Sequence, residues 1–116
     1  MATFETFENA KDLIFQTHYY KASYEQIKKV YLEYIDKLGH TVVSINDDYC
    51  EIYSEVPRFT VVAKIIQQDP LETSIDFSII IESLMGGGRK KAEQFIDGAL
   101  KLIEGSYEFK GVALHK

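Results

Sequence analysis

The fold of this chain is decided by the stretch LMGGGRKKAEQFI, residues 84–96, where an alternating strand pattern gives way to a helical one. At about 100° per residue, the apolar residues from Ala92 onward fall within about 80° of Ala92, on one side of a helix. They are Ala92, Phe95, Ile96, Ala99, Leu100, Leu102 and Ile103. Polar residues occupy the other side, and Gly105 is expected to end the helix in a left-handed conformation. Such a helix needs an apolar surface to pack on, and we expect the preceding strands to provide it.

The length and charge of the chain limit its class. Its 116 residues are the size of one domain, and no Pro/Ser-rich break separates a second one, so we expect a single domain over residues 1–116. With 13 basic and 18 acidic side chains, the net charge of −5 repels phosphate backbones and argues against nucleic acid as a partner. No apolar run approaches the roughly 18 residues of a membrane span, so we expect no membrane partner.

The cysteine content and the N-terminus point to a compartment. Cys50 is the single cysteine, so the chain cannot form an internal disulfide, a pattern that fits a reducing compartment. The first residues carry Glu5 and Glu8, where a secretory signal needs basic residues. We therefore expect a cytoplasmic protein.

The predicted order of elements is strand, helix, four strands and helix. Ser23 and Gln26 match a capping box and predict a helix from there to Leu38, which Gly39 ends. Residues 1–11 fit neither a helix nor a strand pattern, and the tail, residues 106–116, is expected to add an edge strand or to dock on a neighbour. The predicted strands, rich in β-branched residues or alternating in polarity, are residues 13–20, 41–45, 49–56, 59–67 and 73–81.

These elements predict an α+β fold, β-α-β-β-β-β-α, in which two helices cover one face of an antiparallel sheet. The alternation in residues 73–81 turns Phe77 and its apolar neighbours Ile75, Ile79 and Ile81 toward the helices. The same parity turns Cys50 inward. The opposite face then carries five large apolar residues: Tyr49, Tyr53, Val62, Ile66 and Ile80.

A patch of this size exceeds what monomers usually leave in water, so something should cover it. The tail, the N-terminal segment with Phe4 and Phe7, or a second copy could do so. Closed two-fold pairing is the commonest solution for small chains, and we therefore predict a homodimer through this face.

The order of elements over residues 12–105 resembles that of the TATA-box-binding-protein-like fold group, which includes the helix-grip proteins. The resemblance matches no family motif, so it assigns no functional residue. It implies a C-terminal helix able to hold an apolar ligand against the sheet, although Phe77 and Phe95 could fill that space instead. The DNA-binding members use the open sheet face, which here would display Glu51, Glu55, Asp76 and Glu82 beside Lys64 and would repel phosphate.

The strongest chemical signal is the segment GGGRKK, residues 86–91. Glycines let backbone N–H groups approach an anion, and cations at a helix N-terminus oppose its dipole unless an anion binds there. The candidate anion-binding residues are Gly86, Gly87, Gly88, Arg89 and Lys90. The spacing matches neither a Walker A loop nor a GxGxxG turn, so a solvated strand-to-helix loop is the competing interpretation.

We predict no metal, cofactor or catalytic residue. His18, His40 and His115 lack metal-ligand spacing, and a single cysteine excludes a CxxC site. An inward Cys50 is interpreted as a small core residue.

The sequence does not specify a function. The hypothesis it favours is a small non-enzymatic module that binds a small-molecule ligand or another protein, because no catalytic set accompanies the expected core. The alternative is a small enzyme or accessory protein that binds an anionic metabolite at residues 86–91.

Overall fold

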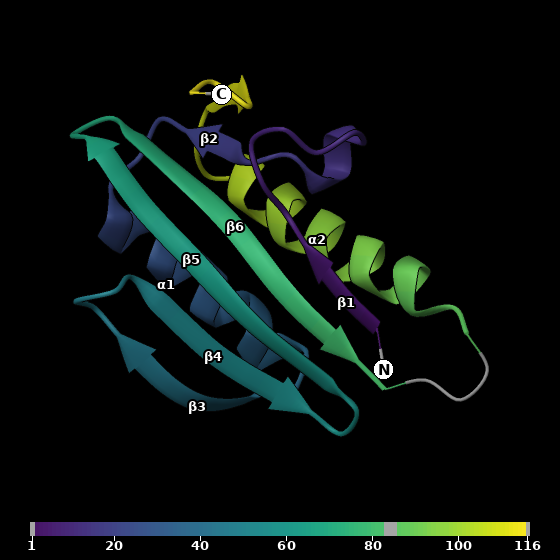
Figure 1. The fold of residues 1–116 in the computed structure, drawn as a ribbon. Coiled ribbons are helices and arrows are strands. Elements are labelled where there is room, and N and C mark those ends of the chain that lie inside the picture. Colours follow the sequence, from purple (N-terminus) through teal and green to yellow (C-terminus); the bar gives the residue numbers. More distant parts are fainter. Residues whose placement is uncertain (1, 83–85, 116) are drawn as a thin grey trace.

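The computed structural model describes residues 2–82 and 86–115, which form two helices and one seven-stranded antiparallel sheet (Figure 1). The helices are α1 (Tyr24–Lys37) and α2 (Gly88–Glu104), and a short 3₁₀ helix, η1 (Leu13–Phe15), precedes the second strand. The strands are β1 (Ala2–Glu5), β2 (His18–Tyr20), β3 (Thr41–Asn46), β4 (Glu51–Val56), β5 (Phe59–Asp69), β6 (Glu72–Ile81) and β7 (Phe109–Val112). The predicted α+β class is confirmed, including a C-terminal edge strand. Residues 83–85, which begin the predicted strand-to-helix connection, lie outside the described residues.

The long hairpin of β5 and β6 is the centre of the sheet. The strand order is β3-β4-β5-β6-β2-β7, and β1 also pairs with β6. β1 and β2 share one edge of β6, because β1 pairs with residues 78–81 and β2 with residues 73–75 (Figure 1). Each half of this edge is thus closed by a different short strand.

The strand predicted for residues 13–20 is wrong in its first half. Residues 13–15 form η1, in which the Phe15 N–H donates to the Asp12 carbonyl at 3.0 Å, and only residues 18–20 pair as a strand. The reason is spatial: β1 already occupies the far part of the β6 edge, so little of that edge remains for β2. β1 itself comes from the segment that showed no clear pattern, since four residues are too few to display a period.

Asp76 lies on β6 where β1 and β2 meet. Its Oδ1 accepts hydrogen bonds from Thr6 Oγ1 at 2.6 Å and from Thr17 Oγ1 at 2.8 Å. The Thr6 N–H also donates to the Phe77 carbonyl, and the Phe77 N–H donates to Thr6 Oγ1, each at 2.9 Å. Between the end of β1 and the start of β2, these contacts to β6 take the place of the regular backbone pairing. Burial raises the pKa of the Asp76 carboxyl, and the two hydroxyls partly oppose that shift.

A raised pKa in the folded state means that protonating Asp76 stabilises the fold. This stabilisation is fully present below the ordinary value of 3.8 and is lost as the pH rises through the higher folded pKa. We expect the free energy of unfolding of the wild type, relative to Asp76→Asn, to increase as the pH falls from about 7 toward about 4. Urea denaturation of both proteins across this range measures the difference. A difference that is constant, or that moves the other way, would contradict the assignment.

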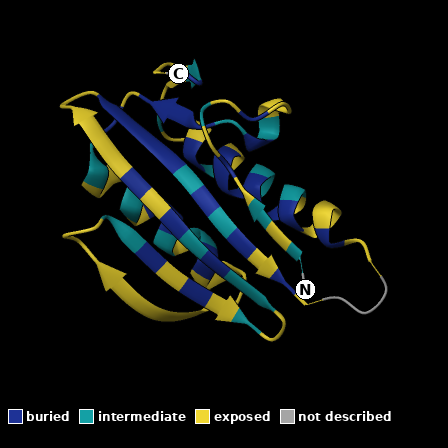
Figure 2. Ribbon diagram, in the orientation of Figure 1, coloured by how far each residue is buried: buried dark blue, intermediate teal, exposed yellow. Residues whose placement is uncertain are grey.

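Both helices cover the same face of the sheet. Ile75, Phe77, Ile79 and Ile81 of β6 are buried, as the alternation predicted. Together with the buried faces of α1 and α2 they form one apolar cluster (Figure 2). Within the described residues, no helix is both long enough and apolar enough to cross a membrane.

The ends of the two helices agree only in part with the sequence patterns. The Ser23–Gln26 capping box is present, and Gly39 is left-handed at φ +77° just after α1. Helix α2 ends before Gly105, as predicted, but the left-handed conformation predicted for Gly105 is wrong, because its φ is −69° and its N–H donates to the Lys101 carbonyl.

The inward orientation predicted for Cys50 is also wrong. β4 begins one residue later, at Glu51, and Cys50 lies in the preceding turn with φ +58°. Its Sγ is 3.6 Å from the Asp47 carbonyl oxygen, and the residue is only partly buried. The turn takes up Tyr49 and Cys50, the two residues that the alternation had assigned to the start of the strand.

Gly98 lets α2 approach α1 closely. A Cβ added there would lie 2.5 Å from the Tyr34 hydroxyl oxygen, and that hydroxyl donates to the Phe95 carbonyl at 2.7 Å. Tyr34 is therefore held in place by the helix on which it packs.

We expect Gly98→Ala to lower the free energy of unfolding by about 1 kcal/mol, because a steric cost of about 1–3 kcal/mol exceeds the helix-propensity gain of about 1 kcal/mol. The same substitution in a Tyr34→Phe background should cost less, since the nearest atom is gone. Chemical denaturation of the four proteins of this double-mutant cycle measures the coupling. Equal costs in both backgrounds would mean that the Tyr34 hydroxyl is not the obstacle.

Candidate interaction surface

We call the sheet face opposite the helices the outer face. It has a closed half at the β2 and β7 end and an open half over β4, β5 and the end of β6 near Ile80. The two halves differ in whether the chain covers its own sheet.

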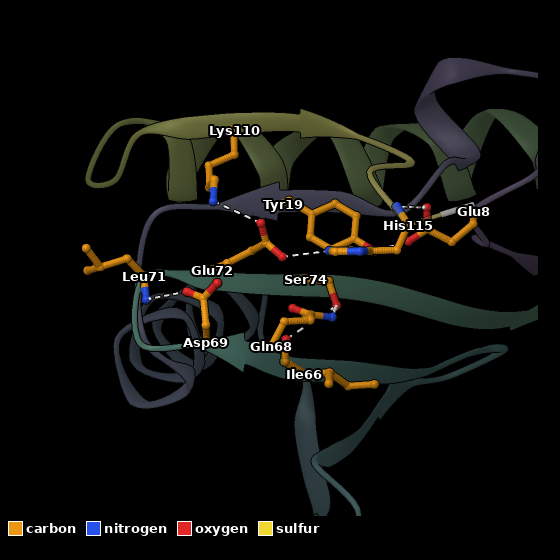
Figure 3. Close-up of polar contacts among 10 residues, drawn as sticks. All are labelled: Glu8, Tyr19, Ile66, Gln68, Asp69, Leu71, Glu72, Ser74, Lys110 and His115. Atoms are coloured by element: carbon orange, nitrogen blue, oxygen red, sulfur yellow. Dashed lines mark hydrogen bonds and ion pairs between the residues drawn. The ribbon is translucent and has the colours of Figure 1, made fainter.

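The closed half is covered by the C-terminal tail, as Figure 3 shows. The Glu72 carboxylate accepts hydrogen bonds from Lys110 Nζ at 2.9 Å and from His115 Nε2 at 2.6 Å, and these bonds lower the pKa of Glu72. The His115 ring packs edge-on against Tyr19, with 5.1 Å between centroids, and the Tyr19 hydroxyl donates to Glu8. Tyr19 is consequently only 2% exposed. The tail thus adds an edge strand and also closes this half.

The open half brings together three of the five residues predicted to form an interface, Tyr53, Val62 and Ile80, and Ile66 lies further along β5, opposite Ser74. Tyr53, Ile66 and Ile80 are each exposed by about 36–37%, and Val62 is half-buried. Tyr53 and Val62 are direct cross-strand partners, and Ile80 lies diagonally from Val62. Tyr49 does not join them in a strand, because it lies in the turn before β4.

Charged residues divide and surround this apolar group. Lys64 separates Val62 from Ile66 along β5, and it pairs in register with Glu51 on β4 and with Asp76 on β6. Further carboxylates on the open half are exposed at Glu55 and Glu82. The open half is therefore an apolar centre with a mainly acidic rim.

β3 adds an exposed edge that the sequence analysis did not single out. All six of its residues are exposed, among them Val42, Val43 and Ile45 (Figure 2). β3 ends the strand order, so its backbone pairs with β4 alone among the described strands. A β-branched run predicts a strand but not its place in the sheet. Residues 41–46 also lack the Lys, Pro and charged residues that commonly mark an edge strand, so the sequence held no signal for this position.

The glycine-rich loop places Arg89 beside carboxylates of the same chain. Its Nη2 bonds Asp12, its Nε bonds Glu93 at 2.8 Å, and its guanidinium lies 5.0 Å from the Phe15 ring centroid. These hydrogen bonds raise the pKa of Arg89. The cation that the sequence assigned to an external anion thus has two partners within the chain.

Gly88 is buried, and a Cβ added there would lie 3.4 Å from the Phe4 ring, but most of the other described residues of the loop are exposed. Gly86 and Gly87 have φ of +79° and +78°, and Lys90 and Lys91 are exposed. A groove of about 570 Å³ beside the loop is lined by Asp12, Leu13, Ile14, Arg89, Lys90, Glu93, Gln94 and Asp97. Its three carboxylates oppose an anion, and the anion site at residues 86–90 stays a prediction.

We expect phosphate to raise the melting temperature of the wild type and of Arg89→Ala with Lys90→Ala equally, because Asp12 and Glu93 already neutralise Arg89. Thermal unfolding in phosphate and in chloride at matched ionic strength makes the comparison. A true site at about ten times Kd would add roughly 1.4 kcal/mol in the wild type alone. That result would establish the anion site instead.

The histidines take part in packing. Burial lowers the pKa of His18 and of His40, and the two rings lie against Phe109 and Phe59, respectively. Across residues 2–82 and 86–115, no three His, Cys, Asp or Glu side chains gather to hold a metal ion.

Aromatic side chains fill the space between the sheet and α2. Phe95 of α2 lies 5.9 Å from Phe77 and 5.3 Å from Phe59, measured between ring centroids. On the α1 side it lies 6.4 Å from Tyr31 and 5.3 Å from Tyr34. Phe77 and Phe95, which the sequence suggested could fill this space, thus pack there.

Comparison of the chain with family models, with curated proteins and with solved structures gave no match. The resemblance to the TATA-box-binding-protein-like group therefore stays a prediction, and the function must be argued from the surface itself.

Proposed function

We propose that this chain is a non-catalytic module that binds another protein through the open half of its outer face. The observation that carries the proposal is the exposed group of Tyr53, Val62 and Ile80, with Ile66 nearby, on a sheet whose other half is covered by the chain's own tail. Clustered apolar residues within a polar rim are typical of protein interaction sites.

The packing under α2 favours a protein partner over a small apolar ligand. A helix-grip arrangement would hold such a ligand between the sheet and the C-terminal helix. In this chain the rings of Phe95, Phe77 and Phe59 occupy that region. The order of elements shared with the helix-grip proteins then describes the scaffold and not a ligand site.

The charges of the rim define the partner. Glu51, Glu55 and Glu82 outnumber Lys64 and Arg58 on the open half, and the whole chain carries a net charge of −5. A protein with an apolar centre and a basic rim complements this surface, whereas nucleic acid does not. A second copy, the partner predicted from sequence, would bring the same acidic rim to the contact.

The free thiol of Cys50 is compatible with a reducing compartment such as the cytoplasm.

Site-specific photo-crosslinking in the cells that produce the protein tests this proposal. With p-benzoylphenylalanine in place of Tyr53, we expect a covalent adduct with another protein. The adduct should be lost when Ile66→Lys and Ile80→Lys are added, because two charges then lie in the apolar group. Phe7 is the matched control, since it is also an exposed aromatic residue but lies between β1 and η1.

Three results decide between the alternatives. An adduct formed at position 53 but not at position 7, and removed by the two lysines, supports the proposal. Equal labelling at both positions, or none at position 53, would contradict it. An adduct of twice the chain mass would identify a second copy as the partner. The open half would then be the interface of a homodimer and not a site for a different protein.

A further inference from the structure

β3 ends the sheet with a bulge as its one usual protection of an edge strand. Such strands commonly carry Lys, Pro or inward-pointing charges that prevent pairing with another chain. Residues 41–46, TVVSIN, contain none of these, and all six are exposed. A bulge at Val43, between Val42 and Ser44 in the pairing with β4, is the only irregularity of the strand.

The apolar layer of the sheet continues onto β3 and is not closed there. Val42 and Ile45 pair in register with Ser54 and Ile52, both of which are fully buried on the helix side. Val42 and Ile45 are nevertheless 41% and 43% exposed. A strand added beside β3 would satisfy its outer backbone groups and extend this layer over the two side chains.

Opposite charges flank the two ends of β3. Lys37, in the last turn of α1, precedes the strand, and Asp47 and Asp48 follow it. Asp47 accepts hydrogen bonds from Lys28 Nζ at 2.8 Å and from the Tyr24 hydroxyl at 2.6 Å, whereas Asp48 is exposed. A neighbouring strand with the same flanks fits best when it runs antiparallel, because its basic end then meets the acidic end.

We propose that β3 pairs antiparallel with β3 of a second copy, so that the two sheets join into one. A two-fold axis between Val43 and Ser44 places Asn46 opposite Thr41, and Asp48 opposite Gly39, two residues from Lys37. Because this axis is perpendicular to the sheet, both open halves face the same side. The contact goes beyond the proposed function, since it uses a different surface and leaves the open half accessible.

The contact is small, and this determines how strong the association is. Specific interfaces usually bury about 1,200–2,000 Å² in total, and one pair of short strands buries less. We therefore expect a reversible dimer with a Kd on the order of 100 µM rather than a permanent one.

Sedimentation equilibrium over a range of concentrations tests the proposal with paired variants. Val43→Lys with Ile45→Lys, at exposed positions of the edge, should weaken association about tenfold or more, because like charges meet across the axis. Val62→Lys with Ile66→Lys, on the open half, should leave it unchanged. Asp48→Lys should weaken the dimer, and adding Lys37→Asp should restore it, because the exchange reverses both charges.

Hydrogen exchange of the wild type gives a second measurement that needs no variant. The amides of residues 41–46 that point away from β4 should become protected as the concentration rises through the Kd, while those of the β4–β5 turn should not change. A wild type that is monomeric at millimolar concentration would overturn the proposal. So would a dimer that the edge variant retains and the open-half variant loses. A monomeric wild type leaves the crosslinking expected at position 53 unchanged, so this inference can fail while the proposed function holds. A dimer through the open half would instead appear at position 53 as an adduct of twice the chain mass, which separates the two failures.

Discussion

The packing of Phe95 is the constraint on which the rest of the structure depends. Its ring lies among Phe77 of β6, Phe59 of β5, and Tyr31 and Tyr34 of α1, so one side chain joins the sheet to both helices. Burying a phenylalanine contributes about 1.5–3 kcal/mol, and ring pairs add about 0.5–1.5 kcal/mol each. The close approach at Gly98 serves the same contact, because it lets the Tyr34 hydroxyl reach the Phe95 carbonyl.

β6 connects this core to the two ends of the chain. One of its edges is fully paired with β5, and the other is shared by β1 and β2. Asp76 lies at their junction, where Thr6 and Thr17 satisfy its carboxylate. These bonds to a half-buried carboxylate attach the N-terminal segment to the central strand.

The unequal coverage of the sheet follows from where the termini attach. β2, β7 and the tail all gather at the Glu72 end, where Lys110 and His115 hold the cover in place. No described segment crosses the outer face at the β3 and β4 end, so apolar residues stay exposed on the open half and along β3 (Figure 2). The parts of the sheet that the chain does not cover are the parts for which we propose partners.

By itself the sequence determined the elements whose period is long and clear. The alternation of residues 73–81 and the stripe from Ala92 to Ile103 predicted the layer order, and the parity of the strands placed Tyr53, Val62, Ile66 and Ile80 on one face. Such patterns are local, because a strand or helix shows its buried side within a few residues. The tertiary structure alone decided which strand lies at the edge, that Asp12 reaches Arg89, and that β1 shortens β2. These outcomes depend on residues far apart in the chain competing for the same edge or charge, and no local pattern records that competition.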